Sequence, residues 1–287
     1  MIKWFTKIPN WAALSLVMNG LLFTTLLAVS QESPVGSDRL LAADLTEELS
    51  PEPTMEDPAV ADAAIADNVI DLPHPSGGRK LSYQQWIDIL AEDAKQMAQK
   101  NPEHLTVLLG DSLSLWFPGE LMPGRRVWIN QSISGEKTKG LLDRLKLLDD
   151  NNVEAVFLMI GINDLIWGEK DEEILKNYKE IVRRLKKEHP KTQIVVQSIL
   201  PHSGENSTWE SRDKLAALPS ERIISMNQTL KSIAADNNAY YLDLYPIFVT
   251  GDGELRPDLT TDGLHLNRQG YLVWRSAIAL YAQLELQ

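Results

Sequence analysis

Short apolar runs alternate with amphipathic helical stretches along residues 81–287, and this alternation constrains the fold more than any other feature of the sequence. Each run suits a buried strand, and each helical stretch suits a crossover between parallel strands. Right-handed crossovers place helices on both faces of such a sheet. The predicted strands are 105–109, 126–130, 155–160, 193–199 and 240–244, and the predicted helices are 82–99, 138–149, 171–188, 220–237 and 268–284.

The sequence therefore predicts an α/β domain over residues 81–287, a three-layer αβα sandwich with a five-stranded parallel sheet. Ligands of such sheets bind beyond the carboxyl ends of the strands. We therefore expect functional residues to stand directly after the strands.

Residues 1–30 are predicted to be an N-terminal signal peptide or membrane anchor. Lys3 and Lys7 precede an apolar run over 11–29, which is long enough to span a bilayer as a helix. Residues 28–30 suit a signal peptidase, but the run exceeds the ~7–15 apolar residues of a cleavable core, which favours an uncleaved anchor. The rest of the chain would then face the periplasm from a bacterial inner membrane, or be exported.

Residues 31–80 are predicted to be a disordered acidic linker rich in proline and alanine. Much of the chain's net charge of −12 comes from this segment. A strongly acidic balance argues against nucleic acid as a partner. The chain has no cysteine, which excludes disulfides, thiolate metal sites and a cysteine nucleophile.

Polar residues or glycines follow the first three predicted strands. Ser112, in the segment Gly-Asp-Ser-Leu-Ser, stands at a strand-to-helix turn, either as an exposed nucleophile or as a helix cap. Gly135 follows the second strand and either lets the backbone approach a ligand or serves as an ordinary turn glycine. Asn163 follows the third strand, where its amide either donates to an oxyanion or binds its own backbone.

Asp262 and His265 precede the last predicted helix. Serine hydrolysis needs a base and a carboxylate that orients the base, and this spacing supplies both on one turn. The alternatives are a surface pair or part of a metal site. The sequence has no cysteine or paired-histidine cluster to complete a metal site, so we expect neither a metal nor an organic cofactor.

These four segments, in this order, resemble the signature blocks of the SGNH/GDSL hydrolases over residues 104–287. The resemblance implies a flavodoxin-like sheet, with Ser112 as nucleophile, His265 as base and Asp262 as the third member of a triad. It also implies an oxyanion hole formed by Ser112, Gly135 and Asn163. The segment 132–135 is similar to that of the bacterial thioesterase I/lysophospholipase group.

The resemblance implies a hydrolase that cleaves carboxylic esters or thioesters, as an esterase, lipase or lysophospholipase does. Its substrate would be an acyl ester of a small molecule, lipid or polysaccharide. Two alternatives stay open: an O-acyltransferase that acts on envelope polysaccharide, and a catalytically silent module that binds carbohydrate or lipid.

Aromatic residues near the predicted catalytic edge either line an acyl pocket or lid, or pack in the core. They are Trp116, Phe117, Trp167 and Trp209. The segment 201–218 is long and polar for an α/β connection, which suggests a loop that covers the substrate. His202 in this segment is expected to be a solvated loop residue.

Overall fold

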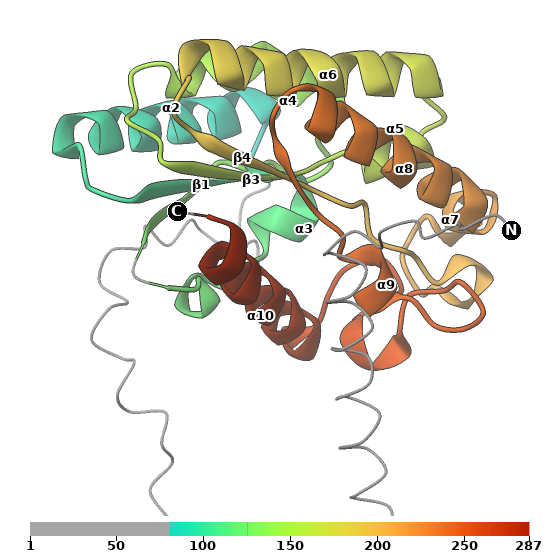
Figure 1. The fold of residues 1–287 in the computed structure, drawn as a ribbon. Helices are drawn as coiled ribbons and strands as arrows, with labels where there is room; N and C mark the ends of the chain where they lie inside the picture. Colours follow the sequence, from blue (N-terminus) through green and yellow to red (C-terminus); the bar gives the residue numbers. More distant parts are fainter. Residues whose placement is uncertain (1–80, 125, 287) are drawn as a thin grey trace, which may run out of the picture. The chain divides into compact units, whose positions relative to one another are not determined.

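The computed structural model describes residues 81–124 and 126–286 (Figure 1). The predicted signal peptide or anchor (1–30) and the predicted acidic linker (31–80) lie outside these residues, and both stay predictions.

Five parallel strands form the sheet. They are β1 (Leu105–Gly110), β2 (Val127–Asn130), β3 (Ala155–Met159), β4 (Gln193–Gln197) and β5 (Tyr240–Leu242). Their order is β2-β1-β3-β4-β5, and every neighbouring pair is parallel. β1 and β3 are buried along their whole length, as central strands covered on both faces should be. The predicted α/β fold with a five-stranded parallel sheet is confirmed.

β4 and β5 end at Gln197 and Leu242, before the predicted ends at 199 and 244. The Ser198 hydroxyl accepts hydrogen bonds from the backbone N–H groups of Leu244 and Tyr245, both at 2.8 Å. These bonds replace ladder bonds and turn the chain out of the sheet. Ile199 and Leu244, beyond the ladder, remain buried, so their apolar character alone did not mark the end of each strand.

Helices cover both faces of the sheet (Figure 1). One face carries α2 (Tyr83–Lys100), α4 (Thr138–Arg144), α6 (Asp171–Glu188) and α8 (Ser220–Asp236), and the other carries α3 (Ser112–Leu115) and α10 (Arg268–Glu285). The predicted helix 138–149 is divided, because its last turn tightens into the 3₁₀ helix η3 (Leu145–Leu148). The connections also contain α5 (Ile162–Ile166), α7 (Arg212–Ala216), α9 (Tyr245–Phe248), η2 (Gly119–Leu121), η4 (Gly204–Asn206) and η5 (Pro257–Leu259).

Sequence signals at the helix ends explain where the long helices begin. Ser82 caps α2 in a capping box with Gln85. Asn267 caps α10, and its side chain accepts a hydrogen bond from the N–H of Gly270. α6 has three acidic residues in its first turn and two lysines in its last, which complements the helix dipole.

α10 is attached to the sheet by polar as well as apolar contacts. The Tyr271 hydroxyl donates to the carbonyl of Leu113 at 3.0 Å, and the Trp274 indole N–H donates to the Gln197 side chain at 2.7 Å. α10 begins three residues after His265, so these bonds hold the helix that follows this histidine against α3 and β4.

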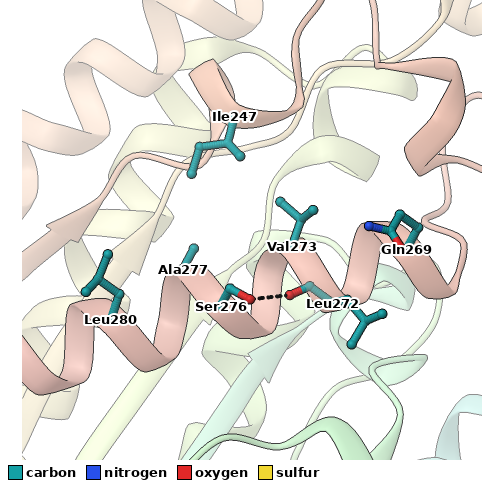
Figure 2. A pocket seen from close by; sticks show the side chains of 7 residues that line it. All are labelled: Ile247, Gln269, Leu272, Val273, Ser276, Ala277 and Leu280. Carbon is teal, nitrogen blue, oxygen red and sulfur yellow. Dashed lines mark hydrogen bonds between the residues drawn. The ribbon is translucent and has the colours of Figure 1, made fainter. Parts of the chain in front are cut away.

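The outward face of α10 borders an apolar groove of about 380 Å³ (Figure 2). Ile247 projects from α9 toward this face, and the exposed Leu280 closes one end. The groove thus lies on the solvent side of α10.

Within residues 81–286, Arg125 aside, no helix is both long and apolar enough to cross a membrane. The predicted membrane segment at 11–29 lies outside the described residues.

The reversal in strand order falls between β1 and β3. In sheets of this topology, a crevice opens beyond the carboxyl ends of the two strands at the reversal. Ser112 follows β1 and Asn163 follows β3, so the fold places both at this point.

Candidate active site

Ser112 is the first residue of α3 and is buried. Asp111 caps the helix by accepting a hydrogen bond from the N–H of Leu113 at 3.1 Å. A Cβ atom on Gly110 would lie 2.2 Å from the carbonyl oxygen of Met159, so only glycine lets β1 end this close to β3. The helix cap is therefore Asp111 and not Ser112, for which the sequence had allowed either a capping or a nucleophilic role.

Ser112, His265 and Asp262 form one hydrogen-bonded chain. Ser112 Oγ lies 3.0 Å from His265 Nε2, and His265 Nδ1 lies 2.8 Å from Asp262 Oδ2. The other carboxylate oxygen of Asp262 accepts from the backbone N–H groups of His265 and Leu264, at 2.8 and 2.9 Å. Four hydrogen bonds therefore hold three residues that come from opposite ends of the domain.

The environment of Asp262 favours its ionised form. Burial alone would raise the pKa of this carboxyl, but the His265 ring and the two backbone N–H groups outweigh burial and hold the pKa below its usual value. A carboxylate in this position fixes which ring nitrogen of His265 carries the proton, and leaves Nε2 to accept from the Ser112 hydroxyl.

The segment 201–218 supports the turn that carries Asp262. The Asp262 carbonyl accepts from the Ser207 hydroxyl at 2.6 Å and from the N–H groups of Thr208 and Trp209 at 2.9 and 3.1 Å. Gly263 has a φ of +88°, and a Cβ there would lie 2.8 Å from Ser207 Cα. Sequence reasoning suggested a loop that covers the substrate, and the structure shows that this segment also supports the turn that carries Asp262.

Gly135 lies in the loop after β2 and Asn163 lies in α5 after β3, and a hydrogen bond joins these two segments. Gly135 has a φ of +76°, which favours glycine. The Asn163 amide donates to the carbonyl of Glu136 at 3.2 Å, and the N–H of Ile133 donates to the carbonyl of Gly110 at 3.2 Å. The loop after β2 is thereby joined both to Asn163 and to the strand that ends at Ser112.

Glu136 forms a buried ion pair that sequence reasoning missed. Its carboxylate accepts two bonds from the Arg144 guanidinium, at 2.8 and 2.5 Å, and the side chains of Arg144 and Glu136 are only 4% and 1% exposed. The Tyr83 hydroxyl of α2 donates to the same carboxylate at 3.0 Å. Burial and this carboxylate raise the pKa of Tyr83 to about 12. Glu136 lies in the loop before α4, so the i,i+3 and i,i+4 spacings that indicate ion pairs on a helix could not indicate this pair.

Two more buried carboxylates lie behind the site. Asp164, next to Asn163, accepts from the N–H and the hydroxyl of Thr138 at 2.9 and 2.6 Å, and thereby joins α5 to the start of α4. One oxygen of Asp111 is buried without a hydrogen-bond partner among the described residues. Burial raises the pKa of Asp111 to about 7; the bond from Leu113 opposes this shift, and Glu136 and Asp164 add to it.

The four tryptophan and phenylalanine candidates occupy different environments. Phe117 is buried and packs edge-on against Tyr271 and Trp274 on α10, which is a core role. Trp209 is partly buried against the core.

Of the other two tryptophans, Trp116 contacts the site, and Trp167 follows α5, the helix that carries Asn163. The Trp116 ring centroid is 4.1 Å from that of His265. Trp167 ends α5 and is 48% exposed, and the Lys214 ammonium lies 5.2 Å from its ring centre.

The prediction that His202 is solvated is wrong. Its side chain is buried, and Nδ1 accepts from the N–H of Gly204 at 3.0 Å. Burial lowers the pKa of His202. The first residue of η4 binds the ring, a contact that the polar sequence around His202 did not indicate.

Over the described part of the chain, no group of three histidine or acidic side chains is arranged to hold a metal ion.

Comparisons with known proteins show the family of this chain. The family model of the GDSL-like lipase/acylhydrolase family matches residues 108–273, a range that contains Ser112, Gly135, Asn163, Asp262 and His265. The bovine (Bos taurus) platelet-activating factor acetylhydrolase IB subunit alpha1 is 23% identical over 197 residues, which cover 65% of this chain and 78% of the relative.

Solved structures share the fold. A platelet-activating-factor protein from Streptococcus pneumonia has a TM-score of 0.62 at 24% identity, covering 69% of this chain and 93% of the other. A GDSL-like lipase from Bacteroides thetaiotaomicron has a TM-score of 0.55 at 20% identity, covering 68% and 98%. The chain belongs to the GDSL-like lipase/acylhydrolase family and is a hydrolase that acts on esters.

Proposed function

We propose that this protein is a serine hydrolase that cleaves carboxylic esters or thioesters through an acyl-enzyme on Ser112. The observation that carries the proposal is the chain of contacts from Ser112 Oγ to His265 Nε2 (3.0 Å) and from His265 Nδ1 to Asp262 Oδ2 (2.8 Å). A hydroxyl, a base and a carboxylate in this order are the groups that acyl transfer requires.

In the first step, Ser112 Oγ attacks the acyl carbonyl carbon while His265 Nε2 takes the hydroxyl proton. The imidazolium is stabilised by the Asp262 carboxylate. The tetrahedral intermediate then collapses, the bond from carbon to the alcohol oxygen or thiol sulfur breaks, and the imidazolium protonates the leaving group. In the second step, His265 activates a water that attacks the acyl-enzyme, which releases the acid and restores Ser112.

The negative oxygen of each intermediate would be held by the N–H groups of Ser112 and Gly135 and by the Asn163 amide. Two features support this assignment. Ser112 begins a helix, where backbone N–H groups lack helical partners. The Asn163 amide contacts the carbonyl of Glu136, the residue after Gly135, so the proposed donors lie on adjoining segments.

For the substrate, the similarity to a platelet-activating factor acetylhydrolase subunit supports an ester with a short acyl group. The exposed Trp167, with Lys214 beside it, offers an apolar surface next to a positive charge, which suits an ester that carries both an apolar part and an anionic group.

We also propose that the chain acts at the periplasmic side of a bacterial inner membrane, or outside the cell. The apolar run over 11–29 and the two lysines before it support this location. Membranes washed with alkaline carbonate should retain the full chain and release a variant that lacks residues 1–30. Release of the full chain would exclude the uncleaved anchor.

The test of the activity is hydrolysis of a graded series of p-nitrophenyl acyl esters by the full chain and by Ser112→Ala under the same conditions. Turnover by the wild type that is lost in Ser112→Ala would support the serine mechanism, and the preferred acyl length would define the substrate class. Wild-type turnover that survives in a folded Ser112→Ala variant would contradict the proposal. Adding a sugar acceptor to the same assay would detect acyl transfer as loss of free acid.

A further inference from the structure

Three sides of the His265 ring have a described neighbour. Ser112 lies at the Nε2 edge and Asp262 at the Nδ1 edge, as described above. The third neighbour is Trp116, whose indole covers one face of the imidazole with 4.1 Å between ring centroids and 35° between ring planes. The two hydrogen bonds at the ring edges leave the imidazole free to tilt about the line that joins its two nitrogens. The contact with the Trp116 indole limits this tilt.

Trp116 is carried by the same short helix as the nucleophile. Its backbone N–H donates to the carbonyls of Ser112 and Ser114 at the end of α3. The Asn130 amide donates to the carbonyl of Ser114 at 2.6 Å and thereby fixes this helix end to β2. These bonds fix the backbone of Trp116 relative to Ser112.

No described residue accepts a hydrogen bond from the indole Nε1, which is buried. The orientation of the ring therefore depends on packing, and the His265 ring is the aromatic partner in that packing. The neighbouring Phe117 behaves differently, because it packs against α10 and belongs to the core.

We propose that Trp116 is a positioning residue for His265, holding the imidazole between Ser112 and Asp262 and stabilising the imidazolium that forms during each proton transfer. The face of an indole is negative and attracts a cation whose centre lies within about 6 Å of the ring centre. The imidazolium forms as the proton is transferred, so this attraction strengthens in both transition states and lowers the barrier to acylation and deacylation. The inference rests on the proposed function of Ser112 and His265.

The test compares three variants of the full chain. Trp116→Leu removes the ring, Trp116→Phe keeps a smaller ring, and Phe117→Leu is the matched control that removes the adjacent aromatic without touching His265. Three quantities are measured: the rate at which a fluorophosphonate labels Ser112, kcat and KM for a p-nitrophenyl ester, and the histidine ring resonances of ¹³C-histidine protein by NMR.

We expect Trp116→Leu to slow labelling and kcat by roughly 2- to 30-fold, with little change in KM. Trp116→Phe should recover part of the loss. One histidine ring resonance, assigned to His265 by its absence from His265→Asn, should move in Trp116→Leu because the indole ring current is gone. Phe117→Leu should lower thermal stability while labelling, kcat and that resonance stay at wild-type values.

Wild-type labelling of Trp116→Leu with an unmoved His265 resonance would overturn the proposal. Equal losses in Trp116→Phe and Trp116→Leu would overturn the role of the aromatic ring, and Trp116→Phe keeps the test decisive if the leucine variant does not fold. Failure of the wild type to be labelled would instead overturn the proposed function, while the NMR shift would still report the stacking.

Discussion

At the scale of single residues, Asp111 is the group whose burial has the clearest consequence. The pKa of its carboxyl is raised to about 7 in the folded protein, above the unfolded value of 3.8. Between these two pH values the folded state binds more protons than the unfolded state. Asp111 therefore destabilises the folded state progressively as the pH rises from about 4 to about 7. A salt-bridged carboxylate has the opposite effect and stabilises the folded state as the pH rises.

We expect Asp111→Asn to keep the helix cap and to remove this pH dependence. Between pH 4 and pH 8, the free energy of unfolding should fall by roughly 2–4 kcal/mol more in the wild type than in the variant. This order of magnitude follows from about 1.36 kcal/mol per unit of pKa shift. Urea unfolding at several pH values measures the difference. Asp213→Asn, which removes an exposed carboxylate, is the control. Parallel curves for wild type and Asp111→Asn would show that Asp111 does not carry the effect.

Asn163 is the residue whose loss separates catalysis from folding. Its described side-chain contact is one hydrogen bond of 3.2 Å to the carbonyl of Glu136. Asn163→Ala should lower kcat by about 10²–10³ and change the melting temperature little. The control is Asn177→Ala, which removes an amide on α6 that donates a hydrogen bond to the Thr138 hydroxyl of α4. Near-normal ester turnover by folded Asn163→Ala would remove this residue from the oxyanion hole.

At the scale of elements, the ion pair of Glu136 and Arg144 joins the loop after β2 to α4, and the Tyr83 bond extends it to α2. Arg144→Met would leave a buried carboxylate without its cation. We expect a loss of about 3–5 kcal/mol in the free energy of unfolding.

A double-mutant cycle tests this coupling. Glu136→Gln combined with Arg144→Met should recover part of the stability, because the neutral amide no longer needs a cation. Urea unfolding of the two single variants and the double variant gives the coupling energy. Additive losses would mean that the two side chains do not stabilise each other.

At the scale of the whole molecule, the sheet holds together two helical layers, and Trp274 joins one layer to β4. Its indole is fully buried and donates to Gln197 at 2.7 Å. Trp274→Phe should lower the free energy of unfolding by about 2–4 kcal/mol, because it leaves a small cavity and a Gln197 amide oxygen without its donor. Thermal unfolding measures the loss, and adding Gln197→Leu should restore part of it. No recovery in the double variant would show that the cavity alone sets the cost.

The αβα layering followed from local patterns. Strand and helix periodicity depends on neighbouring residues, and the burial of β1 and β3 on both faces produced the continuous apolar runs that were predicted. Strand ends at β4 and β5 were predicted less well, because the Ser198 hydroxyl ends the ladder through bonds that no local pattern indicates.

The sequence by itself determined the fold class and indicated Ser112, Asp262 and His265, because a parallel sheet brings the residues after its strands to one edge. The tertiary structure alone decided which other groups surround them. The Glu136–Arg144 pair, the Trp116 ring on His265, the burial of His202 and the support of the Asp262 turn by segment 201–218 all depend on packing between distant segments. Periodicity reports which face of an element is buried, and it carries no information on the side chain that will lie opposite.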